Sequence, residues 1–507
     1  MTRQHLKWRL AALAAGALPA LAFPAPGLWW LAYGAVVPLL LLVRAAGTPR
    51  QAALLAWCGG TGFMLAVHHW LLPSLHVFIL LIGALLGALW APWGWLAHRL
   101  LRGEPGLARA AAAVVLVPSG WLLVELARSW EYLGGPWGLM GASQWQVPAA
   151  LKLASLGGVW LVGFLVLAVN TLLVLAASGR RARTVSAVAL AAGAVTVSSA
   201  WLWAPRPGDA GTSRIAVVQP GVVRGYEARF DRSEELTREL AGRDLDLIVW
   251  GESSVGADLT DHPDFRRRLG ALAQQTDAEI LVNVDARRSD QPGIYKSSVL
   301  IGPDGDVRGR YDKQRLVPFG EYVPARDLLG WATSVGKAAG EDRRRGEEPV
   351  VMPLADGLKT GPLVCFESAF PDMSRHLAAN GTDLLIAQSA TSTFQDSWAP
   401  QQHASLAALR AAETWRPMVH ATLTGVSAAY GPDGSKAGAW LGTDASAATV
   451  YDVPRGSGTS PYVRYGDWPL GVALGSIALY CAAEGLRAFR RRTVPGPTVR
   501  PARTAHE

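Results

Sequence analysis

The chain has 507 residues, of which 50% are hydrophobic and 17% charged, and its formal net charge is +8. Soluble domains usually carry about 25% charged residues, so this composition argues against an ordinary soluble enzyme and favours a membrane protein. The basic residues lie in short clusters between apolar stretches and form no aromatic-interleaved basic face, so we expect no nucleic acid as a partner.

Apolar stretches long enough to cross about 30 Å of hydrocarbon recur along the first part of the chain, and another follows near the C-terminus. Lys7 and Arg9 precede the first stretch as in a secretory signal, but a second apolar run follows at once and favours a retained helical hairpin. We predict eight spans, at 8–24, 27–44, 52–72, 76–98, 107–127, 154–177, 185–203 and 468–487.

The Lys and Arg residues between these spans gather in alternate connections. The connections near residues 25 and 73 carry none, and the long connection from 128 to 153 carries only Arg128 and Lys152. The opposite side carries clusters such as 180–183 and 490–492. Because basic residues resist translocation, we expect both termini in the cytoplasm and the segment between the last two spans on the extracytoplasmic side.

That segment is polar enough to form a folded domain of its own. Its stretches rich in Val, Ile and Leu predict strands or hairpins at 214–221, 246–254, 279–287, 296–313, 358–366, 383–390 and 417–434, with helices at 227–242, 262–276 and 400–413. Buried strands separated by helices indicate an α/β layered domain. We divide the chain into a membrane domain (1–203), an extracytoplasmic catalytic domain (204–467), an eighth transmembrane helix (468–487) and a cytoplasmic basic tail (488–507).

Three predicted strands of this domain each end in a residue that can carry chemistry: Glu252, Lys313 and Cys365. Singly, each has an ordinary explanation as a solvated charge or a buried thiol. Together they form a complete set, because a thiol needs a base and its acyl intermediates need a cation or N–H donors beside the oxyanion. We expect Glu252 to take the thiol proton, and Lys313 to lower the pKa of Cys365 and to stabilise the oxyanion with the backbone N–H of Phe366.

The order Glu, Lys, Cys at strand ends resembles the nitrilase superfamily, whose members cleave or form amide-type bonds through a thioester on the cysteine. The stretch YDKQRLVPFGEYVP (311–324) is similar to the lysine motif of the apolipoprotein N-acyltransferases, the membrane-bound branch of that superfamily. Three further stretches, at 21–40, 121–144 and 154–170, resemble the first hairpin, the fifth span and the sixth span of that family. The resemblance covers nearly the whole chain.

The resemblance implies a polytopic α-helical membrane domain joined to an α/β nitrilase-like αββα sandwich. It also implies a supporting role for Glu321, which lies eight residues after Lys313 as the second essential glutamate of the family does. For Glu367, positioning of the site and a purely structural role both stay open. The chain departs from the family pattern in two segments. It has QSATSTF (388–394) where many members carry Asn-Asp-Ala-Trp-Phe, and TLTG (422–425) in place of a later Asn-Asn-Gly.

The implied activity is lipoprotein maturation in a bacterial plasma membrane. Cys365 would take an acyl chain from a phospholipid as a thioester and pass it to the α-amino group of a diacylglyceryl-modified cysteine on an apolipoprotein. No metal or organic cofactor is expected, because the acyl group arrives on the lipid. Two alternatives stay open: a membrane-tethered amidase that transfers the acyl group to water, and a catalytically silent binding protein.

Overall fold

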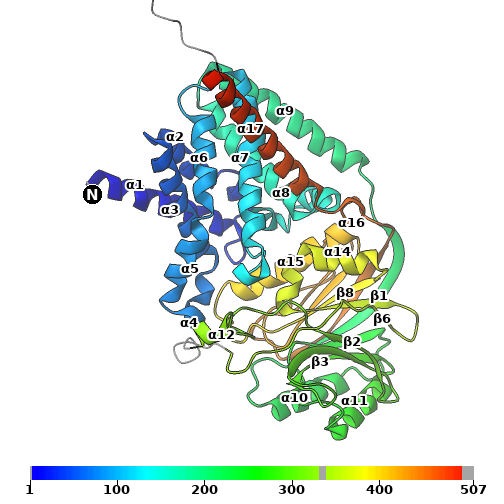
Figure 1. Ribbon diagram of the computed structural model, residues 1–507. Coiled ribbons are helices and arrows are strands. Elements are labelled where there is room, and N and C mark those ends of the chain that lie inside the picture. Colours follow the sequence, from blue (N-terminus) through cyan, green and yellow to red (C-terminus); the bar gives the residue numbers. More distant parts are fainter. Residues whose placement is uncertain (1–2, 331–338, 494–507) are drawn as a thin grey trace, which may run out of the picture.

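The computed structural model describes residues 3–330 and 339–493. A helical part lies at the top of Figure 1 and an α/β part lies below it. The helical part contains α1 (Arg3–Ala17), α2 (Val37–Ala45), α3 (Pro49–Val67), α4 (Leu72–Leu75), α5 (Phe78–Gly87), α6 (Trp90–Leu101), α7 (Leu107–Arg128), α8 (Pro148–Ala176), α9 (Arg180–Trp203) and, from the other end of the chain, α17 (Trp468–Thr493).

Within the described ranges, four helices are long and apolar enough to cross a membrane: α7, α8, α9 and α17. A fifth span forms if α5 and α6, which are bent by 41° relative to each other, are counted as one. The apolar sequence before residue 46 is instead divided into α1, two short 3₁₀ helices and α2, because Pro19, Pro24 and Gly27 interrupt it. The count of eight spans therefore stays a prediction.

The first sheet of the α/β part has six strands in the order β11-β1-β2-β3-β4-β5. The first three strands in sequence are parallel to one another, and the remaining neighbours are antiparallel. The strands are β1 (Gly208–Gln219), β2 (Leu247–Trp250), β3 (Glu279–Arg287), β4 (Ile294–Ile301), β5 (Val307–Asp312) and β11 (Ala447–Ser457).

The second sheet has five strands in the order β10-β9-β8-β7-β6, of which β7, β8 and β9 are parallel. The outer face of the first sheet packs on α10 (Tyr226–Arg238) and α11 (Pro263–Thr276), and that of the second on α14 (Pro371–Ala379) and α15 (Ala399–Thr414). The strands are β6 (Met352–Pro353), β7 (Lys359–Val364), β8 (Leu384–Ser389), β9 (Met418–Thr422) and β10 (Ala428–Tyr430). The layers follow the order of an αββα sandwich.

Alternation of side chains along the strands produces two separate cores in this sandwich. In β1, Ile215 and Val217 point into the core between the sheets, whereas Ala216 and Val218 point to the core under α10 and α11. The outer face of the second sheet shares one continuous core with the helical part. The second sheet is thus joined to the helical part by packing as well as by chain connections (Figure 1).

The predicted strands and helices of this part are confirmed at nearly every position, and β3 agrees with its prediction residue for residue. The elements that were not predicted include the helix α14 and the strands β6 and β11. The eighth predicted span corresponds to α17, which continues to Thr493, so the first residues assigned to the basic tail are helical. The rest of that predicted tail, 494–507, lies outside the described residues.

Candidate active site

The strands β2, β5 and β7 deliver Glu252, Lys313 and Cys365 to one end of the sandwich. Nζ of Lys313 lies 3.7 Å from Oε1 of Glu252, and the charges of both residues act on the Cys365 thiol. Lys313 and Glu252 are buried and Cys365 is half-buried. The structure therefore brings together the three residues that the sequence singles out.

Glu321 joins this cluster from the loop after β5. Its Oε1 accepts a hydrogen bond from Nζ of Lys313 at 2.8 Å, and its Oε2 accepts one from the backbone N–H of Val317, also at 2.8 Å. One oxygen of this carboxylate thus holds the lysine and the other holds its own loop. This geometry agrees with the supporting role expected for Glu321.

A second lysine, Lys296 on β4, belongs to the same cluster and was not singled out from the sequence. Its Nζ donates to Oε1 of Glu252 at 2.6 Å and lies 3.0 Å from Oε1 of Glu321. Lys296 is adjacent to Lys313 in the β-structure, since its carbonyl accepts the Lys313 N–H at 2.8 Å. The available signal was a lysine inside an apolar strand, IYKSSVLI, where a charge needs a partner.

The buried charges shift one another's pKa values. Burial opposes the ammonium form of Lys313, but the carboxylates of Glu321 and Glu252 outweigh burial and raise its pKa. Burial opposes the charged form of Glu321 too, yet Lys313 and Lys296 bring its pKa down to about 2. Both groups therefore stay charged at neutral pH.

The pKa of Cys365 is shifted toward the neutral form of the side chain, whereas those of Lys313 and Glu321 are shifted toward their charged forms. Burial and the Glu252 carboxylate raise the pKa of Cys365 to about 12, although Lys313 and Lys296 act to lower it. Lys313 thus has the expected effect on the thiol, but burial and Glu252 outweigh it. At rest Cys365 is a thiol, and it needs a base inside the site to become a nucleophile.

The backbone at Cys365 is held in an unusual conformation, with φ of 52°. A positive φ is uncommon for residues other than glycine and needs support from its surroundings. Glu367 gives that support, because its carboxylate accepts from the N–H groups of Val364 (2.7 Å) and Gln314 (2.7 Å) and from the hydroxyl of Tyr311 (2.8 Å). Glu367 therefore braces the turn that carries Cys365 and ties it to the loop after Lys313.

His403 on α15 supports the same turn from behind. Its Nε2 lies 3.0 Å from the carbonyl oxygen of Cys365 and 2.9 Å from Oγ of Ser368, and its Nδ1 lies 3.0 Å from Oγ of Ser389. Burial brings the pKa of His403 down to about 4, so the ring is neutral at neutral pH. The sequence gives no sign of this role, because His403 lies on a helix without any motif.

A loop of the helical part contacts Phe366, the residue after Cys365. Gly135, with φ of 71°, lies against the rings of Phe366 and Phe370, and a Cβ added to it would lie 2.5 Å from Cζ of Phe366. In the same loop, Nε1 of Trp137 donates to Oε1 of Gln402 at 2.8 Å, next to His403. The helical part thus touches both sides of the turn around Cys365.

The two segments that depart from the family pattern contact each other beside Glu252. The N–H of Thr391 donates to the carbonyl of Thr424 at 2.8 Å, and the hydroxyls of Ser392 and Thr424 lie 2.8 Å apart. The carbonyl of Ser389 accepts from the N–H groups of Glu252 (3.1 Å) and Leu423 (2.8 Å). The changes therefore fall together, on the segments that fix the backbone of Glu252.

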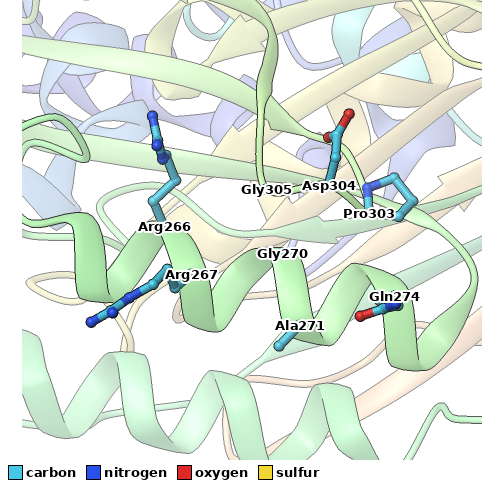
Figure 2. A pocket seen from close by; sticks show the side chains of 8 residues that line it. All are labelled: Arg266, Arg267, Gly270, Ala271, Gln274, Pro303, Asp304 and Gly305. Atoms are coloured by element: carbon cyan, nitrogen blue, oxygen red, sulfur yellow. The ribbon is translucent and has the colours of Figure 1, made fainter.

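A pocket of about 270 Å³ lies far from this cluster, between α11 and the turn that joins β4 to β5 (Figure 2). Arg266, Arg267 and Asp304 line it, and it includes none of the residues described above. In the described part of the chain, no three His, Cys, Asp or Glu side chains are grouped to hold a metal ion.

Comparisons with known proteins cover the whole of this architecture. Residues 15–172 match the model of the apolipoprotein N-acyltransferase N-terminal domain, and residues 214–457 match that of the carbon-nitrogen hydrolases. Apolipoprotein N-acyltransferase from Pseudomonas putida is 32% identical over 93% of this chain and 96% of its own length. The corresponding protein from Azotobacter vinelandii is 33% identical over 98% of this chain and 99% of its own. Among solved structures, a mutant amidase of the nitrilase superfamily from Nesterenkonia AN1 is 20% identical and aligns with 52% of this chain and 97% of its own, with a TM-score of 0.38.

Proposed function

Because the chain belongs to the apolipoprotein N-acyltransferase family, we propose that it transfers an acyl chain from a phospholipid to the α-amino group of the diacylglyceryl-modified N-terminal cysteine of apolipoproteins. The observation that carries this proposal is the environment of Cys365. A thiol kept protonated by burial, with a buried carboxylate and a buried ammonium acting on it, suits acyl transfer in a place from which water is excluded.

The first half-reaction forms an acyl-enzyme. Glu252 removes the thiol proton as Sγ of Cys365 attacks the ester carbonyl carbon of the phospholipid. Nζ of Lys313 and the backbone N–H of Phe366 stabilise the negative tetrahedral oxygen. The bond to the glycerol oxygen then breaks, Glu252 returns the proton to that oxygen, and a lysophospholipid leaves behind a thioester on Cys365.

The second half-reaction uses the same groups in the same order. The free α-amino group of the lipoprotein attacks the thioester carbon, and Glu252 takes a proton from the nitrogen. The C–S bond breaks as the amide forms, and the proton returns to the sulfur of Cys365. An amine attacks a thioester more readily than an oxygen ester. The covalent intermediate therefore lets the amide bond form at neutral pH.

The placement in the membrane is part of the proposal. We place the protein in a bacterial plasma membrane as a multi-pass protein with eight spans, both termini cytoplasmic and the catalytic domain (204–467) extracytoplasmic. The alternation of basic residues supports this orientation. The four or five apolar helices and the contact of a helical-part loop with Phe366 support a site that two lipid substrates reach from the bilayer.

The experiment that tests the activity is intact mass spectrometry of the detergent-purified protein after incubation with phospholipid. We expect a hydroxylamine-labile acyl adduct that disappears when a diacylated lipopeptide is added, with the acyl group recovered on the peptide amine. Cys365→Ala should give no adduct, whereas Cys58→Ala, which removes a half-buried thiol on α3, should behave as the native protein.

Two other results would contradict the proposal. Decay of the adduct to free fatty acid at a rate that the lipopeptide does not change would identify a hydrolase. An adduct that forms equally on Cys365→Ala would show that the acyl group is attached elsewhere.

A further inference from the structure

Lys296 has no role in the proposed reaction, yet it contacts three carboxylates in or beside the site. Its Nζ is 2.6 Å from Oε1 of Glu252, 3.0 Å from Oε1 of Glu321 and 3.8 Å from Oδ2 of Asp285. Asp285 is paired on its other side with Arg343, whose Nη2 lies 3.3 Å from Oδ1. The side chain of Lys296 is 12% exposed, whereas that of Lys313 is fully buried.

The two lysines divide the carboxylates unequally. Lys296 donates to Oε1 of Glu252 at 2.6 Å, while Lys313 is 3.7 Å from the same atom and donates instead to Glu321. Because Lys296 occupies Oε1, the other oxygen of Glu252 is the one that can receive a proton. Because Lys296 also balances the charge of Glu252, the Lys313 ammonium does not need to donate to Glu252. Lys313 can therefore donate to an oxyanion.

The charges of the cluster also balance only when Lys296 is included. Glu252 and Glu321 carry two negative charges, and Lys313 alone supplies one positive charge. An uncompensated carboxylate buried beside the thiol would oppose formation of the thiolate. With Lys296 present the cluster is neutral overall, and it stays neutral when the proton moves from Cys365 to Glu252, so the transfer takes place without an uncompensated buried charge.

We propose that Lys296 is a positioning residue of the active site, which holds one oxygen of Glu252, leaves the other free to take a proton, and leaves Lys313 available for the oxyanion. This inference rests on the proposed acyl transfer, but its effect on the thiol does not depend on any lipid. Lys296 also contributes directly to lowering the pKa of Cys365. Removing Lys296 should therefore make the thiol harder to deprotonate even without a substrate.

The test compares Lys296→Met, which removes the charge, with Lys296→Arg, which keeps it, in a chain carrying Cys58→Ala and Cys481→Ala so that Cys365 is the remaining cysteine. The first readout is alkylation of Cys365 by iodoacetamide at a fixed pH in the absence of lipid. The second is the rate of thioester formation with phospholipid as a function of pH. Lys359→Met, which removes an exposed lysine of β7, is the matched control.

We expect Lys296→Met to slow alkylation about 10-fold, since a nearby cation is worth on the order of one pKa unit. It should slow thioester formation by about 10²-fold, the scale of a misplaced general base. The rise of that rate with pH should move to higher pH, because Glu252, Glu321 and Asp285 then face Lys313, Arg343 and the thiol without their shared cation. Lys296→Arg should recover most of both rates, and Lys359→Met should match the native protein.

Unchanged alkylation and thioester formation in Lys296→Met would overturn the inference. Equal losses in Lys296→Met and Lys296→Arg, with the pH dependence unmoved, would do the same, because they would mean a packing role. If Lys296→Met does not fold, Lys296→Gln removes the charge and keeps a hydrogen-bond donor, and the same results are read from it. If the native protein forms no thioester while alkylation still depends on Lys296, the acyl donor is wrong and the positioning role stands.

Discussion

The two sheets of the sandwich are covered by different kinds of helix. Helix α10, over the first sheet, buries residues such as Phe230 and Leu236 and exposes its other face, as surface helices do. Helix α15, over the second sheet, buries every residue except Gln401, because it lies between the sheet and the helical part (Figure 1). Cys365 and His403 both belong to the second, enclosed side. Cys365 therefore lies where the two parts of the molecule meet, on the side that is enclosed by both.

The difference between the two helices can be tested on two ion pairs, one on each helix. In both, a Glu follows an Arg by three residues. On α15, Arg410 and Glu413 are 2.7 Å apart and both are buried, and Glu413 also accepts from the N–H of Val159 on α8. Glu413→Ala should lower the free energy of unfolding by about 3–5 kcal/mol, because it leaves Arg410 charged and unpaired in the interior. Thermal unfolding in detergent measures this. A loss below about 1 kcal/mol would mean that water reaches this interface.

The next prediction concerns the thiol on the enclosed side. With its pKa raised to about 12 by burial and by Glu252, Cys365 at pH 8 should hold about 10³-fold less thiolate than an ordinary thiol of pKa near 9. Its alkylation by iodoacetamide should accordingly be slow and should keep rising with pH through pH 10. The same chain unfolded in denaturant, with Cys58 and Cys481 replaced by alanine, is the reference for an ordinary thiol. A plateau below pH 9 in the folded protein would contradict the expected shift.

The contact between the two parts gives a prediction on activity. Gly135→Ala should slow acyl transfer by about 10²-fold, because the new Cβ would push on Phe366 and displace the turn of Cys365. Gly134→Ala is the control, since Gly134 also has a positive φ, of 99°, but has open space around its Cβ position. Acyl-enzyme formation, timed by mass spectrometry, measures both. Similar losses in the two variants would assign the effect to loop strain and not to Phe366.

The smallest effect is expected on the water-facing side. On α10, Arg232 and Glu235 form the pair that matches Arg410 and Glu413, at 2.5 Å, but the side chain of Glu235 is 63% exposed. Glu235→Ala should change the free energy of unfolding by less than about 1 kcal/mol, because water screens the pair and solvates the arginine left behind. A loss as large as that of Glu413→Ala would remove the contrast between the two helices.

The sequence predicted most strands because the buried strands are runs of Val, Ile and Leu. It did not predict β11, which carries Pro454 and many half-exposed residues, since only its position at the edge of the first sheet makes a proline tolerable. The helix α14 was missed although Pro371 marks its first turn. The number of spans could not be settled by hydropathy, because the N-terminal prolines and glycine break long apolar runs into short helices.

The site shows the same division. Glu252, Lys313 and Cys365 could be found because each follows a strand, and Glu321 because its spacing matches a family motif. His403 could not, because its role depends on the packing of α15, which no local pattern records. For Lys296 the sequence offers only a charge inside an apolar strand, and its partners depend on pairing across strands. The sequence also could not predict that the pKa of Cys365 is raised, since the direction of this shift depends on how completely the site is buried.

The burial of α15 has a consequence for how the molecule can be divided. Cutting the chain before β1 and after β11 would release a segment with a complete pair of sheets, yet the side of α15 that packs on α8 would then face water. Such a fragment would expose a broad face of alanine and leucine, and Glu413 and Gln402 would lose the hydrogen bonds that Val159 and Trp137 donate to them. The helical part therefore does more than attach the sandwich to a membrane. It packs on α15 as a fifth layer beside the four layers of the αββα sandwich.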